Sequence, residues 1–446
     1  MRLGESELRE YAKRFEKVKA DFEAAATSFG LPFAAPREDG ASGVNAAALR
    51  ARAVENLAAR GAHVENDGKS IWLNWLPPAC VACRTGERTE SFVTSMQCPR
   101  NCFFCFNPNQ PNYEYYRTHE NPLTQDLLDK YGRGERYDFV AVTGGEPLLH
   151  LEKTTAFLRL ARELYPSAHT RLYTSGYQMD DAAVRALAEA GLDEVRLSVK
   201  LDDPKAGVDE ALRVVERCAG RFGAVMVEMP VFPDHVDAMK RLLVGLDEVG
   251  AAGINMLELG FPFHNAEEFK RRGYLLKPDP YRVVYGYWYS GGLPIEGSER
   301  AALSLVEFAL NAKLSLGVHY CALENRLTGQ VYQQNAPAAS SFPLRTMSPR
   351  DHFLKSAKAF GAAVRPVRAA LDELGLGAQT DSLDAPSGSF LEFPLSSLEP
   401  LASRLPDVAV GISYGIAEQT DGAYVLRELK LEQTAPAAFV CAAQAV

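Results

Sequence analysis

Apolar strands alternate with amphipathic helices along the middle of the chain, and this alternation restricts the fold more than any other feature. Apolar segments such as "YDFVAVTGG", "DEVRLSVK" and "GINMLELGFPF" recur at intervals of roughly thirty residues, with helical segments between them. Strands that alternate with helices in this way form parallel βα units. Six such units predict an α/β fold built on a partial (β/α)6 barrel of the TIM type.

The alternation also predicts where the domains begin and end. We expect the partial barrel over residues 89–340. Residues 1–88 before it form an N-terminal helical extension with a hairpin, whose turn is the Asn-Asp-Gly segment, and with a Cys-x2-Cys motif. Residues 341–446 change character and predict a small α+β domain, in which residues 347–375 are expected to be helical and several strands follow.

Composition excludes several classes of partner. The chain has 446 residues and a net charge of −9, with no block of basic residues, so neither nucleic acid nor an anionic membrane is an expected partner. The N-terminus is charged throughout and does not read as a signal peptide. No run of apolar residues is long enough to span a membrane. We therefore expect a cytoplasmic protein.

Five of the eight cysteines lie within residues 80–105. In a reducing compartment such clustering predicts metal binding rather than disulfides. Cys98, Cys102 and Cys105 follow the first barrel strand, "ESFVTSM", with the spacing Cys-x3-Cys-x2-Cys. Three thiolates can hold three irons of a 4Fe–4S cluster and leave the fourth iron open for another ligand.

A second interpretation of these cysteines competes with the first. Cys80, Cys83, Cys102 and Cys105 fit the pattern Cys-x2-Cys-x18-Cys-x2-Cys of a structural zinc site, which leaves Cys98 unused. The corresponding function is that of a zinc-stabilised binding protein without catalytic activity. Spacing alone leaves both interpretations open.

The second barrel strand ends in "TGGEP", residues 143–147. Its two glycines permit a close approach of the backbone to a ligand, and Glu146 places a carboxylate at the mouth of the barrel. A zinc ribbon has no use for this segment at the next strand end. Taken alone, however, the segment is equally typical of a tight turn.

Taken in order on a βα barrel, "CPRNCFFC" and "TGGEP" resemble the radical S-adenosylmethionine (radical SAM) superfamily, over about residues 89–325. The resemblance implies an iron–sulfur enzyme whose open iron binds S-adenosylmethionine. It implies that one electron from the cluster cleaves this cofactor to a 5′-deoxyadenosyl radical, which takes a hydrogen atom from a substrate. A flavodoxin or ferredoxin is the implied electron donor.

The resemblance also implies roles for individual residues. It makes Cys98, Cys102 and Cys105 the catalytic cluster ligands and places Phe104 near the adenine of the cofactor. The Gly-Gly-Glu segment is implied to hold the amino end of the cofactor, and it comprises Gly144, Gly145 and Glu146.

Further strand ends supply weaker candidates for cofactor binding. Ser175 ends the third strand and suits a contact to ribose or carboxylate. Ser198 and Lys200 are two residues apart, so they share a face, and Lys200 suits an ion pair with the carboxylate of the cofactor. Glu228 and Glu258 end the next two strands and face either a substrate or barrel ion pairs. For Ser175, Ser198 and Lys200, a solvated turn or a structural ion pair is an equally good explanation.

Cys80 and Cys83 predict a second metal site together with Cys321. Cys321 ends the last barrel strand, "GVHYC", and His319 lies two residues earlier on the same face. An auxiliary 4Fe–4S cluster on the three cysteines, with either an open iron or His319 as its fourth ligand, fits this set. Zinc on the same four residues fits as well.

The order of these motifs is similar to that of an uncharacterised group related to pyruvate formate-lyase activating enzyme. This similarity does not fix a reaction. Our first expectation is an oxidoreductase that acts on a small-molecule substrate. The alternative is modification of a peptide or protein, which includes activation of a glycyl-radical enzyme. The chain lacks the cysteine-rich C-terminal extension of radical enzymes that modify peptides, which disfavours that alternative.

Overall fold

The computed structural model describes residues 2–35, 46–201, 207–284, 292–377, 381–385 and 388–444. The chain divides into two compact units. The barrel unit comprises residues 29–280 and 287–327, and the C-terminal unit comprises residues 1–28, 281–286 and 328–446.

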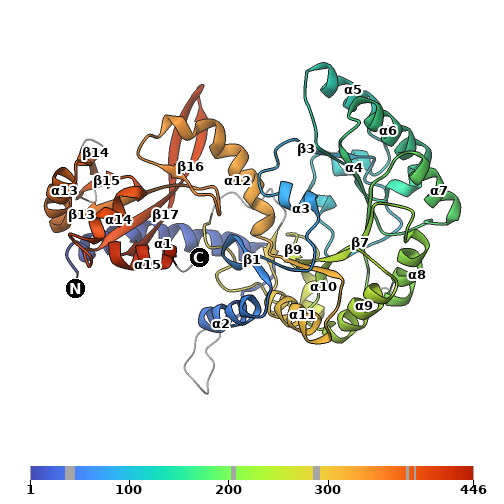
Figure 1. Ribbon diagram of the computed structural model, residues 1–446, viewed down its shortest axis with the longest axis horizontal. Helices are drawn as coiled ribbons and strands as arrows, with labels where there is room; N and C mark the ends of the chain where they lie inside the picture. Colours follow the sequence, from blue (N-terminus) through green and yellow to red (C-terminus); the bar gives the residue numbers. More distant parts are fainter. Residues whose placement is uncertain are drawn as a thin grey trace. The chain divides into compact units, whose positions relative to one another are not determined.

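The barrel unit contains most of the strands and the helices that cover them (Figure 1). Its strands are β1 (His63–Glu65), β2 (Ser70–Leu73), β3 (Thr89–Val93), β4 (Phe139–Thr143), β5 (His169–Thr174), β6 (Glu194–Leu197), β7 (Ala224–Val231), β8 (Gly253–Glu258), β9 (Gly260–Phe261), β10 (Leu293–Pro294) and β11 (Gly317–Cys321). Its helices are α2 (Ala46–Ala59), α3 (Pro78–Ala82), α4 (Tyr113–Tyr116), α5 (Leu123–Gly132), α6 (Leu151–Leu164), α7 (Asp181–Glu189), α8 (Val208–Cys218), α9 (Val236–Glu248), α10 (Ala266–Arg271) and α11 (Ser298–Ala312).

Nine strands of the barrel unit form one sheet in the order β1-β2-β11-β8-β7-β6-β5-β4-β3. Strands β3 to β8 and β11 run parallel, and helices α5 to α9 cover the outer face (Figure 1). The sheet has β1 and β3 at its two edges, so it does not close into a full barrel. The predicted α/β fold with a partial TIM-like barrel is confirmed.

Buried apolar residues on each outer helix follow the helical period. Helix α8, for example, buries Ala211, Val214, Val215 and Cys218. Residues three and four apart lie on one face of a helix, and burial of this face holds α8 against the sheet. A fully buried valine contributes about 1.5–3 kcal/mol relative to an exposed one.

The hairpin of β1 and β2 is present, with Asp67 of its turn in the left-handed region at φ 55°. It extends the barrel sheet, because β2 pairs antiparallel with β11. The first helix, α1 (Glu5–Ser28), belongs instead to the C-terminal unit. Both N-terminal elements thus contact segments far along the chain, and the predicted division at residues 88 and 340 stays a prediction.

The C-terminal unit contains a second, antiparallel sheet in the order β14-β15-β13-β16-β17, and β12 also pairs with β13. Its strands are β12 (Thr346–Met347), β13 (Leu354–Phe360), β14 (Asp381–Ala385), β15 (Gly388–Phe393), β16 (Val410–Thr420) and β17 (Ala423–Thr434). Its further helices are α12 (Thr328–Asn335), α13 (Val364–Glu373), α14 (Leu398–Ala402) and α15 (Pro436–Gln444).

The prediction of a helix over residues 347–375 is wrong for the first half of this segment. Strand β13 occupies it and is central, because Ala357 pairs with Phe393 on one side and with Ile412 on the other. Alanine and lysine favour a helix in isolation, but sheet pairing and burial on both sides outweigh this propensity. The helix begins only at Val364.

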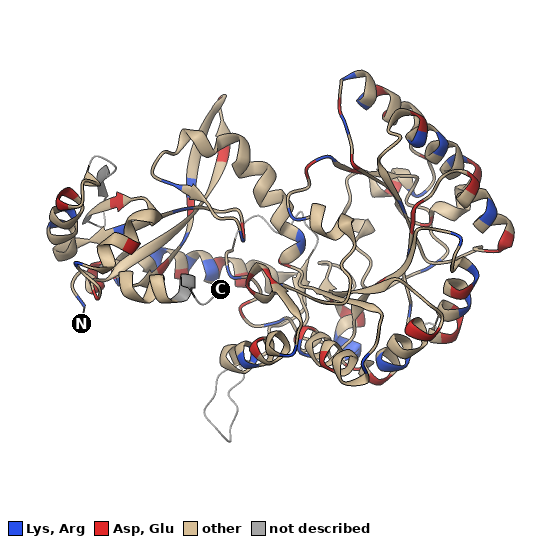
Figure 2. Cartoon of the chain, in the orientation of Figure 1, with Lys and Arg blue, Asp and Glu red and all other residues tan. Residues whose placement is uncertain are grey.

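Charged residues of both signs are interspersed along the outer helices α5 to α9 (Figure 2). This pattern agrees with the absence of a basic block in the sequence. Within the ranges that the structure describes, no helix combines the length and the apolar composition needed to cross a membrane.

Candidate functional site

The cysteine loop, residues 98–105, follows β3 at the end where all the parallel strands finish. Cys98 is exposed, whereas Cys102 and Cys105 are partly buried. The charges of both of these cysteines act on Cys98, so the three predicted ligands lie in one loop. Partial burial raises the pKa of the Cys98 and Cys105 thiols. Metal binding must therefore displace their protons.

The donor set of the cysteine loop fits a cluster that needs three thiolates. Across the described residues, no three His, Cys, Asp or Glu side chains already converge as a metal site, so binding requires the thiols to turn towards one another. Cys80 does not accompany this loop but contacts Arg196 in the middle of β6, at 3.6 Å between Sγ and Nη1. This environment disfavours a zinc site that joins Cys80 and Cys83 to the cysteine loop.

The Gly-Gly-Glu segment after β4 packs against the backbone that leads into the cysteine loop. The backbone N–H of Gly145 donates to the Ser95 carbonyl at 2.8 Å, and that of Glu146 donates to the Gln97 carbonyl at 2.7 Å. A Cβ atom at Gly145 would lie 2.0 Å from the Gln97 oxygen, and one at Gly144 would lie 2.4 Å from the Ser95 oxygen. The two glycines therefore fix the start of the cysteine loop, a role that the sequence did not predict.

Side chains from two other segments fix the end of the loop. Asn107 Nδ2 donates to the Gly144 carbonyl at 2.9 Å. His264 Nε2 donates to the Cys105 carbonyl at 2.8 Å, and Asn265 Nδ2 donates to the Phe103 carbonyl at 3.2 Å. Sequence reasoning missed these residues. The available signal was that His264 and Asn265 follow a barrel strand at its C-terminal end.

The Glu146 carboxylate is fully buried and accepts four hydrogen bonds. Oε1 accepts from the Thr174 hydroxyl at 2.6 Å and from the Leu148 N–H at 3.1 Å. Oε2 accepts from the hydroxyl of Ser175 at 2.6 Å and from its N–H at 2.8 Å. Glu146 thus joins the ends of β4 and β5, and the hydroxyl of Ser175 is already engaged. Contacts of both residues with the cofactor stay predictions.

We expect Glu146→Gln to destabilise the protein by about 2–4 kcal/mol, because the amide nitrogen of glutamine would face N–H and O–H donors and leave them unpaired. Urea unfolding of the apoprotein measures this as a lower midpoint. Glu152→Gln is the matched control, since Glu152 is exposed on α6, and its effect is expected within about 0.5 kcal/mol. Equal midpoints for the two variants would contradict the network described above.

Lys200 and Phe104 lie together beside the cysteine loop. Phe104 is buried, with ring centroids 5.1 Å from Phe103 and 5.3 Å from Phe232. Lys200 Nζ lies 5.2 Å from the centre of the Phe104 ring, and its charge opposes the rise in the pKa of Cys105 that burial causes. The structure therefore places an ammonium group and an apolar wall beside the cysteine loop, while the contacts of Lys200 and Phe104 with the cofactor stay predictions.

The remaining strand-end candidates make contacts within the barrel. Ser198 is half-buried, and its backbone N–H donates to the carbonyl of Thr174, the last residue of β5, at 2.8 Å. Glu228 forms an ion pair with Arg196 at 2.8 Å, and Glu258 forms one with Lys277 at 2.9 Å. The sequence allowed either a substrate contact or a barrel ion pair for Glu228 and Glu258, and the structure shows an ion pair for both.

The second predicted set of ligands faces the inner side of the sheet. Charges on Cys80 and Cys83 would act on the thiol of Cys321. The Cys321 Sγ also accepts a hydrogen bond from Asn325 Nδ2 at 3.3 Å. His319 lies two residues before it, and burial lowers the pKa of its imidazole to about 3, so the ring is neutral. The structure therefore brings the predicted residues of this set into one region, although binding of a metal there is untested.

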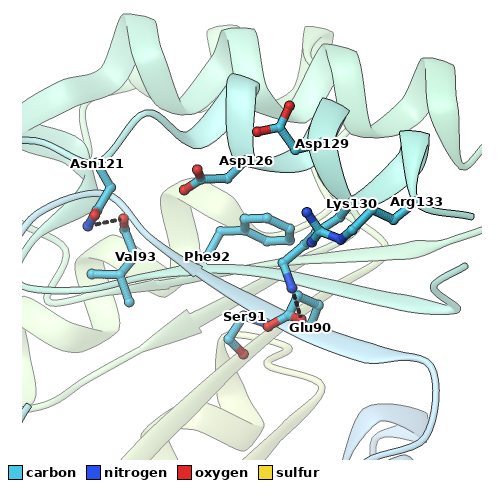
Figure 3. Close-up of a pocket in the computed structure, with 9 residues that line it drawn as sticks. All are labelled: Glu90, Ser91, Phe92, Val93, Asn121, Asp126, Asp129, Lys130 and Arg133. Atoms are coloured by element: carbon cyan, nitrogen blue, oxygen red, sulfur yellow. Dashed lines mark hydrogen bonds and ion pairs between the residues drawn. The ribbon is translucent and has the colours of Figure 1, made fainter. Parts of the chain in front are cut away.

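A surface pocket of about 310 Å³ lies at the edge of the sheet, between β3 and α5 (Figure 3). An ion pair between Lys130 and Glu90, at 2.8 Å, and a hydrogen bond from Asn121 to the Val93 carbonyl cross it. None of the predicted site residues lines it. The pocket is lined by Glu90, Ser91, Phe92, Val93, Asn121, Asp126, Asp129, Lys130 and Arg133.

Residues 92–243 match the family model described as the Radical SAM superfamily. A curated protein of Methanocaldococcus jannaschii, named as a glycyl-radical enzyme activating enzyme, is 26% identical over 253 residues, which cover 55% of this chain and 63% of that protein. The chain therefore spans less than two thirds of this relative.

Two solved structures are also similar. SuiB of Streptococcus suis, bound to the precursor peptide SuiA, is 13% identical with a TM-score of 0.38, over 69% of this chain and 61% of that chain. The radical S-adenosylmethionine methyltransferase TsrM of Kitasatospora setae is 16% identical with a TM-score of 0.34, over 49% of this chain and 51% of that chain.

Proposed function

We propose that the chain cleaves S-adenosylmethionine reductively and takes a hydrogen atom from a polypeptide substrate, a proposal supported by the match of residues 92–243 to the Radical SAM family model. The observation that carries the proposal is the three-cysteine loop at the sheet's C-terminal end, with its start fixed on Gly144, Gly145 and Glu146. Catalytic groups of βα barrels lie at this end of the strands.

Each residue of the site has a distinct role in this proposal. Cys98, Cys102 and Cys105 hold a 4Fe–4S cluster with one open iron. Together with S-adenosylmethionine, such a cluster supplies a 5′-deoxyadenosyl radical. Lys200 provides positive charge for the carboxylate of the cofactor, and Phe104 excludes water next to the third cysteine.

The polypeptide substrate is supported by the name of the Methanocaldococcus relative, which describes activation of a glycyl-radical enzyme. This places the alternative from the sequence analysis before the small-molecule substrate that we expected first. We further propose a flavodoxin or ferredoxin as electron donor, in line with the superfamily resemblance. A cytoplasmic location is also proposed, since clustered thiols suit a reducing compartment.

Deuterium transfer tests both parts of the proposal. The protein is purified and reconstituted without oxygen, then incubated with S-adenosylmethionine, dithionite and a deuterated extract of the source organism. We expect 5′-deoxyadenosine to form and to carry deuterium when the macromolecular fraction of the extract is used. Protease treatment of this fraction should remove the deuterium signal.

Two results would contradict the proposal at different levels. Deuterium that comes only from the small-molecule fraction would replace the polypeptide by a small-molecule substrate and leave the radical chemistry intact. No 5′-deoxyadenosine from a protein that has bound its full complement of iron would contradict the radical chemistry itself.

A further inference from the structure

Arg171 carries a buried positive charge. It lies on β5 and is 4% exposed. Among the described residues its guanidinium forms no ion pair, and its Nε has no hydrogen-bond partner. The rings of Tyr173 and Phe139 lie about 6 Å from its guanidinium carbon. A buried charge without a partner is costly, so this position is suited to an anion.

Arg196, on the neighbouring strand β6, is also buried, but its charge is balanced by carboxylates. It pairs with the carboxylates of Glu194 and Glu228 on the same inner face. Its two Nη atoms also lie 3.6 and 3.7 Å from the Cys80 sulfur. The thiol of Cys80 is therefore held against a guanidinium whose charge is already balanced.

For each of the other two thiols of this region, the cation with the largest electrostatic effect is a guanidinium group. For Cys83 it is Arg171, and for Cys321 it is Arg326. Arg326 donates to a backbone carbonyl, and its Nε has no hydrogen-bond partner in the described part of the chain. Cys80 thus contacts Arg196, and the charges of Arg171 and Arg326 act on the other two thiols. Among the described residues, Arg171 and Arg326 have no carboxylate partner.

Two further unpartnered atoms lie on the same face of the sheet. His319 is 3% exposed and Asn255 is 4% exposed, and the two residues are register partners on β11 and β8. Within the described residues, His319 Nδ1 and Asn255 Oδ1 have no hydrogen-bond partner, while His319 Nε2 lies 2.9 Å from the Ser70 hydroxyl. Buried polar atoms rarely stay unpaired, and several in one region indicate a ligand.

We propose that Cys80, Cys83 and Cys321 bind a metal–thiolate centre on the inner face of the barrel, with Arg171 and Arg326 as its counter-charges. Three thiolates on a doubly positive core, whether zinc or a 4Fe–4S cluster, leave one net negative charge, which offsets one of the two positive charges of the unpaired arginines. His319 supplies the fourth ligand in the zinc form. Binding turns the thiols away from Arg196 and Asn325.

This centre is independent of the radical chemistry proposed above, and metal analysis tests it directly. Iron, sulfide and zinc are measured per chain on protein purified without oxygen. We expect the Cys80→Ala/Cys83→Ala variant to lose about four irons and sulfides or about one zinc relative to wild type. The Cys98→Ala/Cys102→Ala/Cys105→Ala variant is expected to retain that same metal.

Arg171→Gln tests the counter-charge while all three thiols stay in place. We expect the affinity for this metal to fall on the order of 10- to 100-fold, as for other residues that support metal ligands. Cys441→Ser is the control for loss of a thiol, because Cys441 is exposed in α15. It should keep the full metal content.

Either of two metal-analysis results would overturn the proposal. One is wild-type iron, sulfide and zinc in the Cys80→Ala/Cys83→Ala variant. The other is a metal-free Cys98→Ala/Cys102→Ala/Cys105→Ala variant that still melts as a folded protein. Formation of 5′-deoxyadenosine by the Cys80→Ala/Cys83→Ala variant reports the other cluster separately, so failure of the two proposals is distinguishable.

Discussion

Exchange of Cys98, Cys102 and Cys105 for alanine is expected to reduce 5′-deoxyadenosine formation to background. Each thiolate is proposed to hold one iron, and alanine offers no ligand in its place. The fold should survive, because Cys98 is exposed and the other two thiols are only partly buried. The measurement is 5′-deoxyadenosine by liquid chromatography after incubation with S-adenosylmethionine and dithionite, alongside iron per chain.

Two comparisons make the result of the triple exchange specific. Cys441→Ser removes an exposed thiol elsewhere and should form 5′-deoxyadenosine at the wild-type rate. Cys98→Ser/Cys102→Ser/Cys105→Ser keeps the side-chain size almost unchanged and should be as inactive as the alanine form, since a hydroxyl is a poor ligand for iron–sulfur clusters. Normal formation of 5′-deoxyadenosine in either triple variant would disprove the assignment of the cysteine loop.

The sequence predicted the elements of the barrel unit because their signals are local. Strand β4 is an almost continuous apolar run, and helices such as α8 carry their apolar residues at helical spacing. Pairings between distant segments carry no such signal. The hairpin of β1 and β2 joins β11 and α1 joins the C-terminal sheet, although more than two hundred residues separate each pair along the chain.

The same distinction applies to the site. The spacing of Cys98, Cys102 and Cys105 lies within one loop, so the sequence reveals it. The contacts that fix this loop come from segments far along the chain, such as His264 on the Cys105 carbonyl. Arg171 had no motif around it, and only its burial without an ion-pair partner in the described part of the chain draws attention to it. Tertiary contacts of this kind are set by packing rather than by local sequence.

Gly145→Ala is expected to cost the protein most of its cluster while leaving the barrel folded. The added Cβ would lie 2.0 Å from the Gln97 oxygen and 2.6 Å from its carbonyl carbon, and both are backbone atoms that cannot rotate away. The backbone before Cys98 must therefore shift, which moves the first thiol relative to the other two. Overpacking of this kind costs about 1–3 kcal/mol, less than the stability of a typical domain.

Iron per chain measures the loss of the cluster in Gly145→Ala, and the urea midpoint measures its loss of stability. We expect iron bound to the cysteine loop, and with it 5′-deoxyadenosine formation, to fall at least about tenfold, the change that 1.4 kcal/mol of lost binding produces. Gly132→Ala is the matched control, because a Cβ at Gly132 meets no atom within 4 Å at the end of α5. It should leave iron unchanged and the midpoint equal or slightly higher, since alanine restricts the unfolded chain more than glycine does. Wild-type iron and activity in Gly145→Ala would mean that the segment after β4 does not position the cysteine loop.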